Sequence, residues 1–140
     1  FHEAQVPLVK SIIFSLMEMQ EWEAVDQRFD YLAHLYERLY DTDDPRLETG
    51  LQKISSYHVN AFNINLEGRG EYHLRKAANL FKLRLEVAEQ TLTEDHPRLD
   101  YLHESLELSR AHLYLLSNSY RERVKQAQQA NRDALLADLR

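Results

Sequence analysis

The sequence contains no cysteine, and this absence removes several classes of protein at once. Without thiols there is no disulfide framework, no thiolate zinc site and no cysteine nucleophile. The cellular compartment is left open by this absence, with the cytoplasm as the default expectation.

Long apolar runs and an excess of positive charge are also missing. The longest apolar stretch, residues 11–17, is much shorter than the roughly 20 residues that a membrane-spanning helix needs. The net charge is -6, whereas nucleic acids and anionic lipids attract clusters of Lys and Arg. We therefore expect neither insertion into a membrane nor a nucleic-acid partner.

Glycine and proline are scarce, with three of each in 140 residues. Hydrophobic residues make up 44% and charged residues 29%, values typical of one globular domain spanning 1–140. So few helix breakers predict long helices. We place the six breakers at helix beginnings and ends: Pro7, Pro45, Gly50, Gly68, Gly70 and Pro97.

Apolar residues recur at steps of three and four along almost the whole chain, the spacing of a buried helix face. Neither a sustained alternation of apolar and polar residues nor an Asn-Gly or Asp-Gly hairpin signal occurs. The fold class is therefore all-α. The pattern predicts helices over residues 9–17, 22–39, 47–66, 72–92, 99–116 and 120–135.

The chain repeats itself at an offset of about 50 residues, a period typical of repeat architectures. Residues 44–47 (Asp-Pro-Arg-Leu) match residues 96–99 (His-Pro-Arg-Leu). The resulting repeats span roughly 3–44, 45–96 and 97–140. Because proline biases the preceding residue away from helix, both segments predict corners between helices, and Asp95 is the expected cap of the helix after Pro97.

The second repeat resembles a known family. Its second helix and the following corner, read from Ala77 to Pro97, contain Leu80-Phe81, Leu85-Glu86-Val87, Glu89-Gln90-Thr91-Leu92 and Asp95-His96-Pro97. This run is similar to the tetratricopeptide repeats (TPR) of kinesin light chain and related proteins. The present repeats are longer than the roughly 34 residues typical of the class.

The resemblance implies an α-solenoid of about three antiparallel helix pairs wound into a right-handed superhelix. It also implies a scaffold module that holds a protein or peptide in a concave groove lined by the first helix of each pair. No cofactor is expected. We also expect no enzymatic activity, because no group of residues combines a nucleophile, a base and a stabiliser.

Two other interpretations stay open. The chain begins with Phe1 and a helical pattern starts almost at once, so we expect it to be a piece of a longer protein. In that case it could be the sensory or regulatory domain of a larger signalling or transcription-regulating protein. Alternatively, exposed end helices could stack copies of the chain into a homo-oligomer.

The candidate peptide-binding residues are polar residues that share a face of the third or fifth predicted helix. Side-chain amides carry both donors and acceptors and can hold the backbone of an extended peptide, as Asn does in the family that the chain resembles. Arg110 could bind a ligand carboxylate. A solvated helix face is the alternative explanation. The candidates are Gln52, Ser56, Asn60 and Asn63 on the third helix, and His103, Glu107, Arg110 and Tyr114 on the fifth.

Other chemical motifs are set aside. Four potential ligands, His96, Asp100, His103 and Glu107, share a helix face but lack any recognised zinc spacing. A calcium loop starting at Asp41 is rejected because Arg46 and Gln52 stand where Gly and Glu are required. His58 lies on an apolar stripe and is interpreted as a core residue with one satisfied hydrogen bond.

Overall fold

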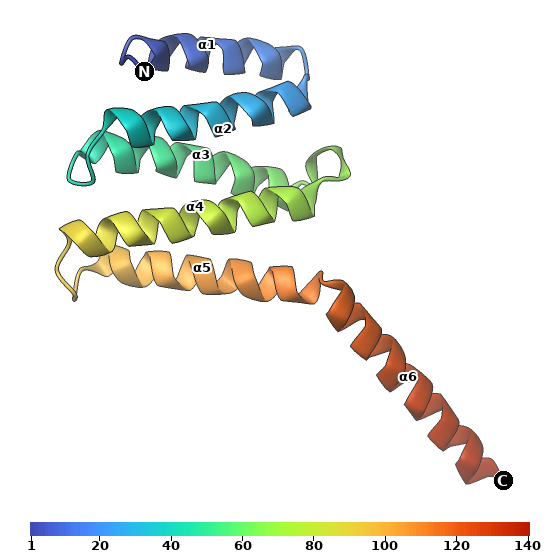
Figure 1. Ribbon diagram of the computed structural model, residues 1–140. Helices are drawn as coiled ribbons and strands as arrows, with labels where there is room; N and C mark the ends of the chain where they lie inside the picture. The colour runs from blue at the N-terminus through green and yellow to red at the C-terminus, as the bar shows by residue number, and fades with distance from the viewer.

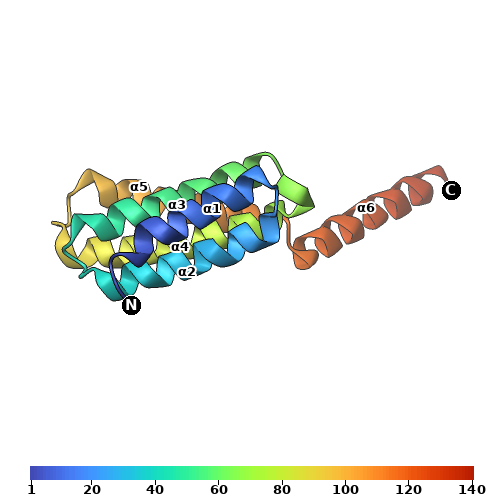
Figure 2. The same cartoon turned by 90° about the horizontal axis from the view of Figure 1, so that it is seen from above.

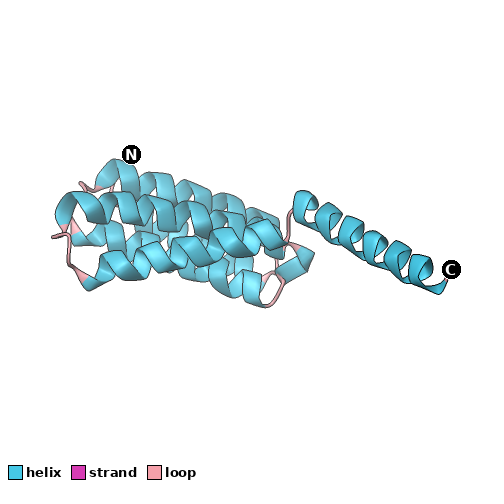
Figure 3. Cartoon of the chain, turned by 90° about the horizontal axis from the view of Figure 1, so that it is seen from below, coloured by secondary structure: helices cyan, strands magenta, loops and turns pink.

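The computed structural model describes residues 1–140, and every regular element in it is helical (Figure 3). The all-α class is confirmed, and the helices end close to the predicted breaks. None of them combines the length and the apolarity needed to cross a bilayer. The elements are α1 (Gln5–Glu18), α2 (Trp22–Leu39), α3 (Pro45–Asn63), the 3-10 helix η1 (Leu66–Gly68), α4 (Gly70–Thr91), α5 (Pro97–Leu115) and α6 (Asn118–Leu139).

Helices α1 to α5 lie side by side in chain order, each antiparallel to the one before (Figure 1). Every helix from α1 to α5 packs on the next one along the chain. Helix α6 touches α5 near its beginning and then leaves the stack, as the view from above also shows (Figure 2).

The two proline corners have matching geometry. The Asp44 carboxylate accepts a hydrogen bond from the Arg46 amide at 2.9 Å, and Pro45 opens α3. At the second corner His96 takes the same place, with its Nδ1 accepting from the Arg98 amide at 3.1 Å. The expected cap Asp95 is therefore corrected to His96, because the residue directly before the proline has the extended backbone of a capping position and its side chain accepts the capping hydrogen bond.

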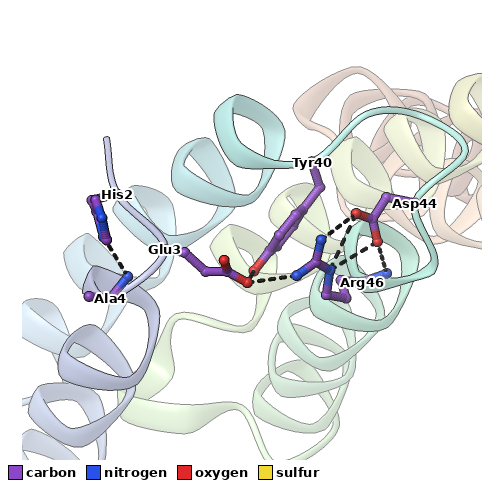
Figure 4. A network of polar contacts seen from close by, with 6 residues as sticks. All are labelled: His2, Glu3, Ala4, Tyr40, Asp44 and Arg46. Atoms are coloured by element: carbon purple, nitrogen blue, oxygen red, sulfur yellow. Dashed lines mark hydrogen bonds and ion pairs between the residues drawn. The ribbon is translucent and has the colours of Figure 1, made fainter.

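The first corner is also tied to the beginning of the chain (Figure 4). Arg46 donates from Nη1 to the Glu3 carboxylate at 2.6 Å and from Nη2 to Asp44 at 2.8 Å. The Arg46 guanidinium lies over the Tyr40 ring, 4.4 Å from its centre. This network fixes the segment before α1 against the α2–α3 corner.

The turn expected around residues 67–70 is confirmed, and it needs residues that tolerate a left-handed backbone. Asn65, Glu67 and Gly68 have φ of 48°, 52° and 70°. The Asn65 side chain also accepts a hydrogen bond from the Gly70 amide at 2.9 Å, which fixes the beginning of α4. Asn and Gly are the residues that adopt this conformation at least cost.

Gly50 does not mark a helix boundary as the sequence suggested, because it lies inside α3 and is buried. Its lack of a side chain allows the ring of Tyr36 on α2 to pack on the α3 backbone. A Cβ atom at residue 50 would lie 2.6 Å from Cε2 of Tyr36, closer than van der Waals contact permits. Gly50 therefore serves helix packing rather than chain reversal.

The core consists of two apolar clusters that share α4. The first joins α1, α2 and α3 with one face of α4 around Val25, Leu35 and Leu51, which are fully buried. The second joins another face of α4 to α5 around Ala77 and Leu102. Burying an aliphatic side chain of this size contributes about 1.5–3 kcal/mol, so these two clusters supply most of the driving force for folding.

Helix α6 contributes nothing to this core, since none of its residues is buried. It is held at its beginning by Ser117, whose hydroxyl accepts a hydrogen bond from the Tyr120 amide at 3.2 Å. Arg123 also donates to the Tyr114 hydroxyl at 3.0 Å.

Candidate functional site

A cavity of about 360 Å³ lies between α3 and α5, above α4. Its floor comes from α4, where Leu74, Phe81 and Arg84 are buried. Its walls come from α3 and α5, and all of their lining residues are exposed or half-buried except the buried Ser55 and Ser109. The cavity has the size of a small ligand pocket, within the usual range of about 300–1,000 Å³.

The α3 wall contains three of the four residues predicted on that helix. Ser56, Asn60 and Asn63 line the cavity, and all three are exposed. Gln52 lies one turn before Ser56 and lines a neighbouring depression together with Arg98 and Tyr101. Apolar atoms of Val59 and Phe62 separate these polar groups, so the wall offers both hydrogen bonds and apolar contact.

The four residues predicted on α5 lie outside this cavity. The α5 wall is formed by Tyr101, Ser105, Leu108, Ser109 and His112 instead. His103 is exposed, Glu107 and Arg110 form a loose exposed pair at 3.9 Å, and Tyr114 bonds to Arg123 of α6. Each predicted residue is two positions from a lining residue, a rotation of about 200° around the helix, which is nearly the opposite face.

The match between the two proline corners could have predicted which residues of α5 line the cavity. The prolines at 45 and 97 set an offset of 52 residues between α3 and α5. Adding this offset takes Ser56 to Leu108 and Asn60 to His112, and both of these line the cavity. The predicted set instead followed the polar residues of α5, whereas the α5 wall is partly apolar because Tyr101 and Leu108 belong to it.

Arg84 forms a buried link between α4 and α3 at the bottom of the cavity. Its Nε and Nη2 donate to Glu48 at 3.0 and 2.7 Å, and its Nη1 donates to the Ser55 hydroxyl at 2.9 Å. The Arg84 side chain is only 4% exposed. Because its charge is already neutralised by Glu48, Arg84 holds the cavity's shape and offers little attraction to an anionic ligand.

A second group of polar residues is buried where α2, α3 and α4 meet, away from the cavity. We call Asp26, His58 and His73 the His-Asp cluster, and all three are buried. The Nδ1 atoms of His58 and His73 lie 2.9 Å apart. One ligand-type atom from each of the three residues lies within 4.8 Å of the others. The interpretation of His58 as a core residue with one hydrogen bond is confirmed.

Asp26 is held by groups on both sides. Its Oδ1 accepts from the Tyr57 hydroxyl at 2.8 Å, and its Oδ2 accepts from Arg69 Nη1 at 2.8 Å. The Asp26 side chain is 4% exposed, whereas that of Arg69 is 37% exposed. The carboxylate is thus buried, while its cationic partner reaches it from the surface.

The electrostatics of the His-Asp cluster favour neutral imidazoles. Burial lowers the pKa of His58 to about 3, with the neighbouring His73 as the second cause. Burial also lowers the pKa of His73. Burial and the hydrogen bond to Asp26 raise the pKa of Tyr57. In the short contact between neutral rings, one Nδ1 carries the proton and donates to the lone pair of the other.

Sequence reasoning missed this cluster because its members come from three separate helices. His73 and Asp26 occupy positions that carry no local motif, and a search for ligands along one helix finds only the surface set around His103. Only the packing of α2, α3 and α4 brings the three side chains together. A buried histidine such as His58 needs a polar partner, and this requirement was the single indication in the sequence that a second polar side chain lies next to it.

Comparison with known proteins adds no relative to this picture: no family model, curated protein or solved structure matches the chain.

Proposed function

We propose that this chain is a binding module that holds an extended peptide segment of another protein in the cavity between α3 and α5. The observation that carries the proposal is the composition of that cavity. Exposed amides of Asn60 and Asn63 face exposed Tyr101 and Leu108 across a floor of buried side chains. This is a mixture of apolar surface and a few polar groups, as in sites that bind small ligands and peptides.

The proposal includes an architecture. The matching corners at Asp44 and His96 support successive, equivalent helix pairs, and we propose that these pairs form a tetratricopeptide-like right-handed superhelix. In that arrangement α3 and α5 are the first helices of neighbouring pairs, so the cavity between them belongs to the concave side. Neighbouring pairs bury each other's apolar faces, as repeat architectures require.

The chemistry of the cavity suggests how a peptide would be held. Side-chain amides of Asn60 and Asn63 can each bond to a peptide N–H and C=O, which is independent of the peptide's side chains. Leu108 and Tyr101 provide an apolar contact for one anchoring side chain of the ligand. With neutral hydrogen bonds worth about 0.5–1.5 kcal/mol each, the affinity is expected to be modest.

The test uses a random 12-residue peptide library displayed on phage and selected on the immobilised chain. The selected peptide is synthesised, and its affinity is measured by calorimetry. The double variant Asn60→Ala/Asn63→Ala should weaken binding at least about 5- to 150-fold, the effect of losing one hydrogen bond from each amide. The matched control His103→Ala/Arg110→Ala changes two exposed residues of α5 outside the cavity and should leave the affinity unchanged.

Circular dichroism of each variant verifies that the helices are retained. If no peptide is enriched, the proposal is wrong. It is also wrong if the His103→Ala/Arg110→Ala variant loses affinity while the Asn60→Ala/Asn63→Ala variant keeps it, because binding would then use the opposite face of α5.

A further inference from the structure

The His-Asp cluster has a composition that structural support alone does not require. It places two imidazoles and a carboxylate together at the junction of three helices, and all three residues are at most 3% exposed. Two imidazoles and one carboxylate form the ligand set that binds zinc and non-haem iron in proteins. These three residues are distinct from those lining the cavity between α3 and α5.

We propose that Asp26, His58 and His73 form a site for one divalent transition-metal ion of the Zn²⁺ or Fe²⁺ kind. Helix α2 supplies the carboxylate, α3 supplies the first imidazole and α4 the second. A single ion would then connect three successive helices of the stack. Its fourth position would be open to water or to a small ligand, as in sites with three protein ligands.

The distances are close to those that a metal needs. Bonds near 2.1 Å in a tetrahedron place two ligand atoms about 3.4 Å apart. The two imidazole Nδ1 atoms, at 2.9 Å, must separate slightly, and the carboxylate must approach from within 4.8 Å. Against the required distance of about 3.4 Å, these are shifts of roughly half an ångström between the imidazole nitrogens and of at most about 1.4 Å for the carboxylate.

The proton between the imidazoles must move when the metal binds. One Nδ1 carries a proton and donates it to the lone pair of the other, so neither Nδ1 is free to bind a metal until this hydrogen bond is broken. Coordination by both Nδ1 atoms requires that this proton transfer to Nε2 of the same ring. Each ring then stays neutral with one N–H, and no net proton is released.

The surroundings resemble those of a coordinated site. Aromatic rings enclose the imidazoles: Tyr57 and Tyr72 meet the His73 ring edge-on, at 5.7 and 5.1 Å between ring centres. The Tyr57 hydroxyl donates to Asp26 at 2.8 Å and orients its carboxylate. Hydrogen bonds of this kind around metal ligands fix their geometry.

Arg69 is the competitor of the metal in this proposal. Its guanidinium occupies the Asp26 Oδ2 atom, and it repels a divalent cation. Because its side chain is 37% exposed and belongs to the loop before α4, it can swing into solvent when the ion enters. Glu23 and Glu67 line the surface depression that contains Arg69. Their negative charges would attract a cation to the place where Arg69 leaves Asp26.

The first test measures binding directly. The purified chain is treated with EDTA, dialysed and titrated with Zn²⁺ by calorimetry and with Co²⁺ by visible absorption. We expect one equivalent of each metal, Co²⁺ bands typical of four- or five-fold coordination, and a thermal midpoint that rises with free Zn²⁺. A folded chain that binds neither metal would overturn the proposal.

The second test assigns the site. Asp26→Asn, His58→Gln and His73→Gln should each abolish the Co²⁺ bands, whereas His34→Gln, which removes an imidazole that is 76% exposed, should not. Because buried substitutions could unfold the chain, Arg69→Gln, which changes a side chain that is 37% exposed, gives an independent result once circular dichroism shows that its helices are retained. It removes the competing cation and should tighten Zn²⁺ binding about tenfold.

Two outcomes contradict this assignment. Zn²⁺ binding that falls in His34→Gln but persists in helical His58→Gln and His73→Gln would identify chelation by surface histidines. Weaker binding in Arg69→Gln would show that Arg69 supports the site instead of competing for Asp26. The peptide test above uses other residues, so either proposal can fail without the other.

Discussion

The ring of Tyr36 packs directly on the backbone of Gly50, so that a Cβ atom at residue 50 would lie 2.6 Å from Cε2 of the ring. This contact brings α2 and α3 together in the middle of the first apolar cluster, where Tyr36 is 4% exposed. It depends on a residue that helix propensity disfavours, since Gly is about 1 kcal/mol worse than Ala inside a helix. At this position the contact between two helices therefore outweighs the low helix propensity of glycine.

Gly50→Ala should destabilise the chain by up to about 2 kcal/mol, because the overpacking cost of about 1–3 kcal/mol is offset by a gain of about 1 kcal/mol in helix propensity. In a Tyr36→Leu background the obstruction is gone, and the same change should stabilise by about 1 kcal/mol. Urea unfolding of wild type, Gly50→Ala, Tyr36→Leu and the double variant gives the coupling free energy between the two residues. Equal effects of Gly50→Ala in both backgrounds would contradict the proposed packing.

The helix boundaries were largely predictable because the residues that end the helices act locally. Pro45 and Pro97 each restrict the residue before them, and this restriction marks a corner whatever the rest of the chain does. Gly50 shows where prediction from local sequence fails. Its role depends on Tyr36, which lies on another helix, and no local pattern distinguishes a glycine that ends a helix from one that admits a neighbouring ring.

The candidate site was predictable on α3 but not on α5. On α3 the buried apolar residues, Leu47, Leu51, Ile54 and Ala61, keep to one side, so Asn60 and Asn63 could be assigned to the open face. On α5 leucines point in several directions: Leu102 and Leu106 are buried, whereas Leu108 is 63% exposed. With apolar residues on several sides, the α5 sequence alone does not reveal which face meets the cavity.

The buried link from Arg84 to Glu48 leads to a second stability prediction. Arg84→Met should cost about 3 kcal/mol, because it leaves the largely buried Glu48 carboxylate without its partner. Arg84→Met/Glu48→Met, which removes both charges, should recover part of this loss. Arg75→Met removes an exposed pair with Glu71 and should change the free energy of unfolding by less than about 1 kcal/mol. Similar losses for Arg84→Met and Arg75→Met would contradict the structural role of Arg84.

Asp44 predicts a dependence of stability on pH. Hydrogen bonds from Arg46 lower the pKa of this carboxyl below its ordinary value of 3.8. A carboxyl whose pKa is lower in the folded state stabilises that state above its unfolded pKa, and this contribution is lost as the pH falls through the folded pKa. Asp44→Asn keeps a good helix cap but loses the charge.

Wild type should therefore be more stable than Asp44→Asn at pH 7, and the difference should shrink as the pH falls below 3.8. The free energy of unfolding in urea, measured from pH 7 to pH 3, gives this difference. Asp43→Asn removes the same charge from an exposed neighbour and is the control. A difference that grows at acidic pH would show that the Asp44 charge does not stabilise the corner.

Removal of α6 tests whether the stack from α1 to α5 is independent of its last helix. None of the residues in α6 is buried, so its removal takes no side chain from the core. A chain that ends at Ser117 should keep its free energy of unfolding within about 0.5 kcal/mol and lose only part of its helical signal. The urea m value should also stay nearly the same, because that value follows the surface exposed on unfolding, and α6 is already exposed in the folded chain.

Removal of residues 1–18 at the other end is the matched comparison. It deletes α1 and with it three buried side chains, Val6, Val9 and Ile13. At about 1.5–3 kcal/mol for each side chain, this deletion should cost roughly 5 kcal/mol or more and lower the m value. If the deletion of α6 proves as damaging as that of α1, α6 must pack on the stack in solution, and the extended position beyond Leu116 would not describe the folded chain.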